Sequence, residues 1–188
     1  MEDEIKEFCS TIRSRSKEHQ DAFNLLVKNG NYGLSISILR QEIDSLIRAA
    51  YIYCLGIKTD EAEKLIKDFV EDKKWFNVTN NGKRQLITDK EMVNLHGGWV
   101  SVVYDFGCKL IHLSKYNAYK KTDPFINMET DKKNEIIGYL KYHHEYNFSD
   151  ISLNKLIPYL PKIMHKIVDN SILSWFSEKR TFYPLKIR

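Results

Sequence analysis

The sequence predicts an all-α fold, a bundle of five to six helices in a single domain that spans residues 1–188. Apolar residues recur at helical spacing along most of the chain, and capping patterns precede several of these stretches. A strand-like pattern is confined to residues 76–87. With 43% hydrophobic and 29% charged residues, the composition is that of a globular protein long enough to bury a core.

Apolar spacing predicts three helices in the part of the chain before Trp75. Residues 3–28 place apolar side chains near helical spacing, and Asn29-Gly30-Asn31 ends that helix as a turn. Residues 34–55 form the second helix, which stops at Gly56. Thr59-Asp60 then caps a third helix whose apolar positions all match the amphipathic template.

The pattern changes between Trp75 and Ile87. Two short apolar stretches flank Asn80-Asn81-Gly82-Lys83, and Asn-Gly is a strong signal for a tight turn. A small β-hairpin is one interpretation, and an irregular polar loop is the other. Because a two-stranded hairpin is marginally stable alone, it would have to pack on another element.

A capping box, with Thr88 at the N-cap and Glu91 at N3, precedes the segment that we expect to form the central helix, Gly98–Ser114. Apolar residues cover most of its circumference, so we expect other elements to enclose it. Residues 130–145 predict the next helix, and Leu153–Lys179 the last. Two prolines early in the last segment predict a short first turn or a bend there, and its apolar side includes Trp175.

The central segment carries one polar stripe. Ser101, Asp105, Lys109 and His112 follow steps of four, four and three, which place them on one side of a helix. One interpretation is the solvated edge of a buried helix. The other is a catalytic site in which Asp105 hydrogen-bonds Lys109 and His112 acts as acid or base near neutral pH.

The second helix carries another polar stripe, formed by Arg40, Asp44 and Arg48 at steps of four. A surface ladder of ion pairs would explain it and would stabilise the helix only slightly. Alternatively, these residues face the stripe on the central helix and form a ligand-binding cleft. Arginine there would hold phosphate in a bidentate manner while Asp44 fixes its orientation.

Other features of the sequence exclude several functions. The net charge is only +4, and the lysine pairs are dispersed, which is unlike a dedicated DNA-binding module. No metal site, glycine-rich phosphate loop or cofactor motif is predicted. The three cysteines form no CxxC pair, no apolar run reaches the roughly 20 residues of a membrane span, and the acidic start lacks a signal-peptide core. We therefore expect a cytoplasmic protein without a membrane partner.

The stretch from Arg40 to Tyr51, with that from Val103 to Ser114 downstream, resembles HEPN-type helical domains. These are found among prokaryotic toxin and phage-defence proteins, including abortive-infection types. The resemblance covers about half of the chain. It implies an all-α bundle, a homodimer and an RNA partner, and in active members metal-independent RNA cleavage.

Active HEPN members carry an arginine, four to six further residues and a histidine near the start of a late helix. Here Asp105 and Lys109 precede His112, and no arginine lies at that distance. Arg13 and His19 fit the spacing, but they lie in the first helix, where side chains six residues apart point in different directions. We interpret that match as chance.

Three functional hypotheses therefore remain open. The first is an RNA-directed HEPN-like protein, either a metal-independent endoribonuclease or a catalytically degenerate relative. The second is a non-catalytic module for dimerisation or for binding another protein. The third is a small-ligand pocket between helices.

Overall fold

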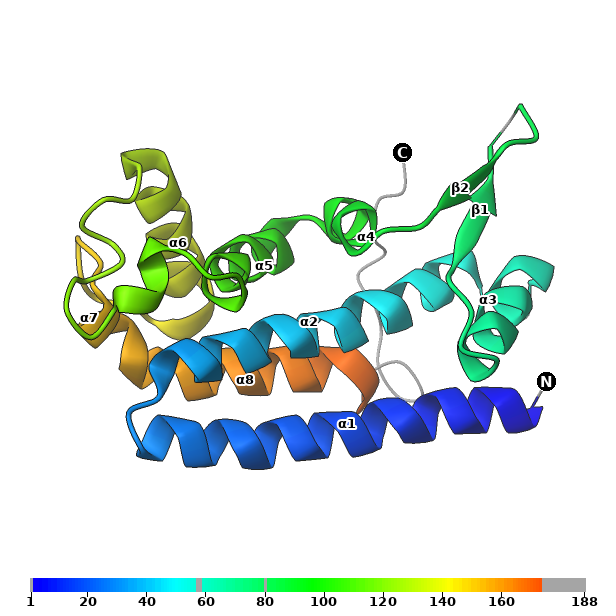
Figure 1. The fold of residues 1–188 in the computed structure, drawn as a ribbon, viewed down its shortest axis with the longest axis horizontal. Coiled ribbons are helices and arrows are strands. Elements are labelled where there is room, and N and C mark those ends of the chain that lie inside the picture. The colour runs from blue at the N-terminus through cyan, green and yellow to red at the C-terminus, as the bar shows by residue number, and fades with distance from the viewer. Residues whose placement is uncertain (1, 57–58, 80, 174–188) are drawn as a thin grey trace.

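Two long antiparallel helices, α1 (Glu2–Lys28) and α2 (Tyr32–Leu55), run along the molecule (Figure 1). The computed structural model describes residues 2–56, 59–79 and 81–173. The turn between the helices requires a left-handed residue, and Gly30 supplies it with φ +70°. The predicted turn at residues 29–31 is thereby confirmed.

The most enclosed helix is α2, which contacts α1, α3, α4, α5 and α8. The sequence pattern instead predicts the segment 98–114 as the most enclosed helix. Small buried serines make α2 look more polar in the sequence than it is in the fold. Ser37 donates its hydroxyl hydrogen to the carbonyl of Gly33, and Ser35 likewise to Asn31, so these hydroxyls are satisfied without water.

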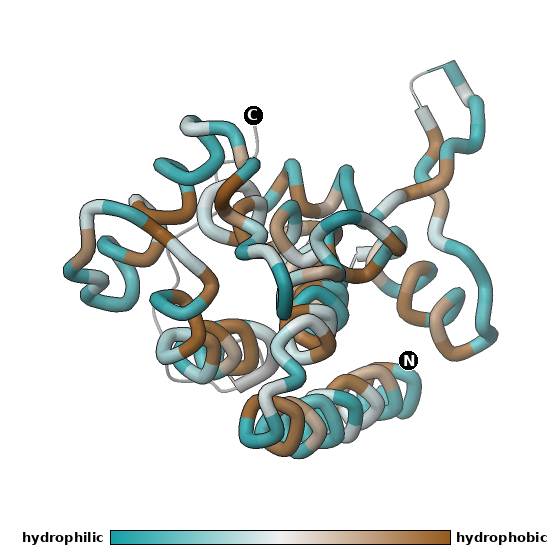
Figure 2. Tube along the Cα trace, turned by 60° about the vertical axis from the view of Figure 1, so that its left-hand side comes forward, coloured by the Kyte–Doolittle hydropathy of each residue, from teal (hydrophilic) through white to brown (hydrophobic). Residues whose placement is uncertain are grey.

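Beyond α2 the chain forms α3 (Asp60–Val70) and a small hairpin of β1 (Phe76–Val78) and β2 (Arg84–Leu86). Phe76 pairs with Leu86 in an antiparallel register, which confirms the hairpin interpretation of residues 76–87. The hairpin projects from the helices (Figures 1 and 2). Buried Trp75 anchors its base, where its ring lies 6.3 Å from that of Tyr51 on α2.

The capping box at Thr88 and Glu91 is confirmed, and it starts the short helix α4 (Asp89–His96). The following helix, α5, runs from Gly98 to Ile111 and packs against α2. Gly97 and Gly98 have φ values of +63° and +54°, which permit the sharp change of direction between the two helices.

α5 ends three residues earlier than predicted, so His112 lies outside the helix in an extended conformation. Side chains that follow the helix take the place of further helical hydrogen bonds. Ser114 Oγ donates to the carbonyl of Lys109 at 2.7 Å, and Asn117 Nδ2 donates to that of Leu110 at 3.1 Å. The next residues form a 3₁₀ turn, Lys115–Ala118.

The last part of the described chain contains α6 (Thr130–His144), α7 (Leu153–Leu156), a 3₁₀ turn (Ile157–Tyr159) and α8 (Leu160–Val168), with a π-helical turn at Asp169–Leu173. The segment predicted as one helix from Leu153 is therefore broken near its two prolines, as expected. Its predicted end at Lys179, with Trp175, lies outside the described residues.

Each of the helices α1 to α8 contributes buried residues to one hydrophobic core. Figure 2 shows hydrophilic residues along the outer side of α1 and hydrophobic residues between the helices. The all-α bundle with one short hairpin is thereby confirmed. In the part of the chain that the structure describes, no helix combines the length and the apolar character needed to cross a membrane.

Candidate functional site

The polar stripe predicted on α2, formed by Arg40, Asp44 and Arg48, lies at the centre of a network of charged side chains. The Asp44 carboxylate accepts a hydrogen bond from Arg48 Nε at 2.8 Å, one turn away on the same helix. Its other oxygen accepts from Arg15 Nη1 of α1 at 2.9 Å. Arg15 also donates to the hydroxyl of Ser45 at 3.2 Å. Asp44 therefore joins α1 to α2 in addition to bridging two turns of α2.

A second carboxylate, Asp89, extends the network to α4. It is the first residue of that helix, and the capping box fixes its position. One of its oxygens accepts from Arg40 Nη2 and the other from Arg48 Nη2, each at 3.1 Å. We refer to Arg15, Asp44, Arg48, Asp89 and Arg40, which are joined in that order, as the Arg–Asp chain.

The Arg–Asp chain is partly shielded from solvent. The side chain of Arg40 is 10% exposed, and that of Arg48 is 29% exposed. Burial alone would raise the pKa of Asp44, but the nearby guanidinium groups of Arg48 and Arg15 outweigh it and hold the pKa below its ordinary value. With three arginines and two aspartates, the Arg–Asp chain has a formal charge of +1.

Aromatic rings fix two of these guanidinium groups. Arg40 lies 3.8 Å from the centre of the Tyr104 ring, and Arg48 lies 5.0 Å from that of Trp75. Arg40 Nε also contacts Cys108 Sγ at 3.3 Å. This close approach of α5 depends on Gly107, because a Cβ atom there would lie 2.6 Å from the Cβ of Arg40.

The structure brings the predicted ligand-binding residues together but separates the predicted catalytic ones from them. Asp105 pairs instead with Lys90 of α4 at 2.9 Å, and Lys109 lies over the ring of Tyr116. His112 is exposed, and within the described residues it makes no hydrogen bond or ion pair.

The predicted catalytic residues lie apart from α2 because they occupy a different side of α5. The face that meets α2 carries Tyr104, Gly107 and Cys108, and the polar stripe lies on an adjacent face. The polar stripes of α2 and α5 therefore do not line a common cleft among the described residues. The predicted cleft shared by the two stripes is wrong. A catalytic role for Asp105, Lys109 and His112 stays a prediction.

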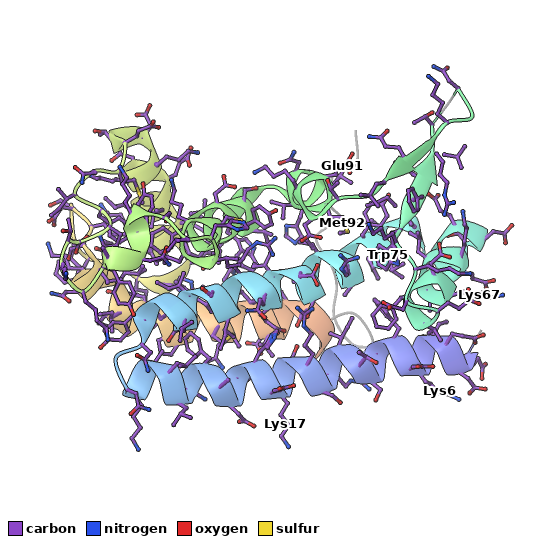
Figure 3. All side chains as sticks on the ribbon, viewed as in Figure 1. Lys6, Lys17, Lys67, Trp75, Glu91 and Met92 are labelled. Carbon is purple, nitrogen blue, oxygen red and sulfur yellow. The ribbon has the colours of Figure 1, made fainter. Side chains whose placement is uncertain are left out.

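The Arg48–Asp89 pair of the Arg–Asp chain borders a groove of about 700 Å³ between α3, the hairpin and α4. Arg48 and Asp89 lie on one side of it. Exposed Lys73 and Lys74 lie on another side, where the chain leaves α3 and enters the hairpin. Figure 3 shows Trp75 at this position, beside the end of α2 and below the hairpin. Charged and aromatic side chains therefore both line the groove.

A second polar cluster, which no sequence pattern predicted, lies between α1 and α2. Glu42 is 0% exposed, and its carboxylate accepts a hydrogen bond from the Ser16 hydroxyl. Its other oxygen lies 2.7 Å from His19 Nδ1. The signal was a single acidic residue next to Ile43 on the otherwise apolar side of α2. Arg13, the other half of the Arg–His pattern in this segment, is exposed.

Among the described residues, no group of three or more His, Cys, Asp or Glu side chains could hold a metal ion. Comparison of the chain with protein-family models, with curated proteins and with solved structures finds no match. The geometry of the Arg–Asp chain and its groove is therefore the main guide to function.

Proposed function

We propose that this protein is an RNA-directed, HEPN-like helical-bundle protein of the cytoplasm that binds single-stranded RNA in the groove beside Arg48. The observation that carries the proposal is the position of Arg48. Its guanidinium group is held between Asp44 and Asp89, packs on Trp75 and still faces the groove. A cation fixed in this way is preorganised for a phosphate group.

The surroundings of Arg48 support the same ligand. Lys73 and Lys74 add two cations to a groove that Asp72 also lines, and Lys73 pairs with Glu71 as well. Arg84 of the hairpin lies 4.0 Å from the centre of the Phe76 ring. Cations interleaved with aromatic rings are typical of proteins that bind single strands. The modest net charge of +4 fits a short strand better than a long duplex.

RNA binding can be tested with a labelled 15-nucleotide RNA and fluorescence anisotropy over a range of salt concentrations. The double variant Lys73→Gln/Lys74→Gln removes two candidate phosphate contacts. We expect about tenfold weaker binding at low salt, and the log–log salt slope should fall by about 1.4. Both residues are exposed, so the fold should be retained.

The matched control is Lys6→Gln/Lys17→Gln, which makes the same change of charge on α1, away from the groove (Figure 3). We expect its affinity to stay within about twofold of the unmodified protein. Equal weakening by both double variants would show that binding depends only on overall charge. That result, or the lack of binding, would overturn the proposed site.

The catalytic form of the proposal places acid–base chemistry on His112 and assigns supporting roles to Asp105 and Lys109 of α5. Incubation with total RNA in the presence of a chelator tests it, with His112→Ala as the matched variant. Cleavage that is lost in the variant supports a metal-independent endoribonuclease. Equal cleavage by both proteins, or none by either, removes this role for His112.

The alternative, a non-catalytic interaction or dimerisation module, is favoured by the apolar surface at the end of α5. Leu113 is 98% exposed, and neighbouring Ile111 is also exposed. A homodimer, which the HEPN resemblance implies, would cover such a surface. Light scattering tests it: Leu113→Ser should shift a dimer toward a monomer, and a strictly monomeric unmodified protein would contradict it.

A further inference from the structure

The hairpin of β1 and β2 projects from the helices, and in the described part of the chain each strand has one edge without a neighbouring strand (Figure 1). Every residue of β2 is exposed. At the base of the hairpin, Ile87 N donates to the carbonyl of Trp75 at 2.9 Å. Because hydrogen-bonded pairs alternate along an antiparallel ladder, Arg84 and Leu86 direct their N–H and C=O groups away from β1.

These outward-facing backbone groups of Arg84 and Leu86 have no hydrogen-bond partner among the residues that the structure describes. They offer two N–H donors and two carbonyl acceptors along one edge. An unpaired edge of this kind is a template on which another extended segment can pair. A hairpin of two strands is only marginally stable alone, so a third strand would also stabilise it.

The side chains beside this edge indicate which kind of strand would pair with it. The register places Phe76, Val78, Arg84 and Leu86 on one face of the hairpin. Val78 is 65% exposed and Leu86 is 39% exposed. The guanidinium group of Arg84 packs on the ring of Phe76 and makes no hydrogen bond or ion pair with a described residue. This face therefore presents apolar side chains next to an unpaired cation.

The charge of the hairpin favours an acidic strand over a second copy of this chain. Lys83 precedes Arg84, and residues 76–86 contain no acidic residue. The acidic residues nearest to them in the sequence, Asp72 and Asp89, lie before and after the hairpin, and Asp89 already pairs with two arginines. Two β2 edges brought together would place like charges close to each other, which destabilises strand pairing.

We propose that the free edge of β2 binds an extended acidic segment of another protein, which adds a third strand to the hairpin. An acidic residue of that segment lies opposite Arg84, and an apolar residue two positions away lies opposite Leu86, because side chains two residues apart share a face. This inference goes beyond RNA binding and does not depend on it, since backbone groups of β2 carry it.

The probe is a labelled nine-residue peptide with threonine at the odd positions and with aspartate and valine in turn at the even positions. Fluorescence anisotropy should show saturable binding of this peptide to the full chain. N-methylation of two consecutive central amides removes a donor from each edge of the peptide and keeps its charge. We expect the methylated peptide to bind about tenfold more weakly, because at least one backbone hydrogen bond is lost.

A proline tests the edge of β2 itself. Leu86→Pro removes the N–H group that faces away from β1 and keeps the hydrogen bond from Ile87 to Trp75. Leu86→Ala is the matched variant, because it shortens the side chain and keeps that N–H group. We expect the peptide to bind about tenfold more weakly to Leu86→Pro than to Leu86→Ala. If Leu86→Pro does not fold, the methylated peptide decides the question on the unmodified protein.

Arg84→Gln tests the charge of the edge. We expect about fivefold weaker binding of the peptide and a smaller dependence on salt, because the ion pair with its aspartate is lost. Arg13→Gln makes the same change at an exposed position of α1 and should stay within about twofold of the unmodified protein. Equal weakening by the two variants would show that the peptide responds only to overall charge and would overturn the assigned edge.

Three further results would overturn the proposal. The first is that the peptide does not bind the unmodified protein at millimolar concentration. The second is equal binding of the methylated and unmethylated peptides, which would show that the peptide does not pair with the backbone. The third is a dimer of the unmodified protein, measured by light scattering, that Leu86→Pro converts to a monomer. A second copy of the chain would then occupy the edge.

Discussion

Two regions of this bundle bury polar side chains in opposite ways. Between α1 and α2, Glu42 is buried with His19 and Ser16 beside it, and the Arg–Asp chain lies near them. Around α6, His144 is 6% exposed, and its Nε2 lies 2.8 Å from the hydroxyl of Tyr139. The first region contains ion pairs between arginine and aspartate, whereas the second buries a neutral histidine.

The pKa values of the second region express this difference. Burial lowers the pKa of His144 to about 4, with smaller contributions from nearby cations such as Lys166. Burial also lowers the pKa of His143 and of Lys166. The ring of Trp99 lies parallel to that of Tyr139, with 6.2 Å between their centres. The comparison shows that a polar group can be buried in a core either with a charged partner or in its neutral form.

The largest expected effect comes from breaking the buried hydrogen-bonded cluster at Glu42. Glu42→Ala leaves His19 and Ser16 without their acceptor and opens a cavity, so we expect a loss of about 4 kcal/mol in the free energy of unfolding. Urea denaturation measures it. Glu42→Gln keeps the shape and should cost less. A loss below about 1 kcal/mol in Glu42→Ala would contradict the pairing.

The neutral region should show its character in the pH dependence of stability. Because the pKa of His144 is about 4 in the folded state and about 6.5 when unfolded, acid favours the unfolded chain. Stability should therefore fall as the pH drops from about 6.5 to 4, by at most about 3 kcal/mol. His144→Gln can still accept from Tyr139 and should flatten this decline. His112→Gln, at an exposed position, is the control and should leave it unchanged.

Asp44→Asn sharpens the comparison within the charged region. The amide keeps the size of the carboxylate but offers one acceptor to two guanidinium groups, so we expect a loss of about 2 kcal/mol. Asp105→Asn is the matched substitution in an exposed ion pair and should cost less than about 0.5 kcal/mol. Chemical denaturation at pH 7 measures both. Similar losses would mean that burial of the Arg–Asp chain has no energetic consequence.

The smallest effect tests how closely α5 approaches the charged region. In Gly107→Ala the new methyl group meets the Cβ of Arg40, which cannot move without the backbone of α2, so we expect a loss of about 1–2 kcal/mol. Gly138→Ala is the matched control on α6, where a Cβ atom meets nothing within 4 Å. It should stabilise the protein by about 0.5 kcal/mol. Thermal unfolding distinguishes the two signs.

The sequence predicted the parts of the fold that depend on neighbouring residues. The capping box at Thr88 and Glu91, the Asn81-Gly82 turn and the spacing of Arg40, Asp44 and Arg48 are all local patterns. Each follows from backbone geometry over a few residues, which a sequence displays directly.

The candidate site was predicted only in part, because most of its contacts join distant segments. Arg15 and Asp89 reach the row on α2 from other helices, and no spacing rule connects them. The end of α5 was predicted too late because Ser114 and Asn117 bond backward to its last carbonyl groups. His112 therefore lost the helical position on which its predicted role depended.

Asp89 makes two ion pairs with α2, and either pair can hold the start of α4 if the other is lost. Arg40 and Arg48 lie two turns apart on α2, and each holds a different oxygen of the same carboxylate. Loss of either arginine still leaves the first turn of α4 tied to α2 through the other. Loss of Asp89 releases both at once, so both ion pairs between the start of α4 and α2 depend on this one aspartate, while buried Met92 and Val93 still hold α4 to the core.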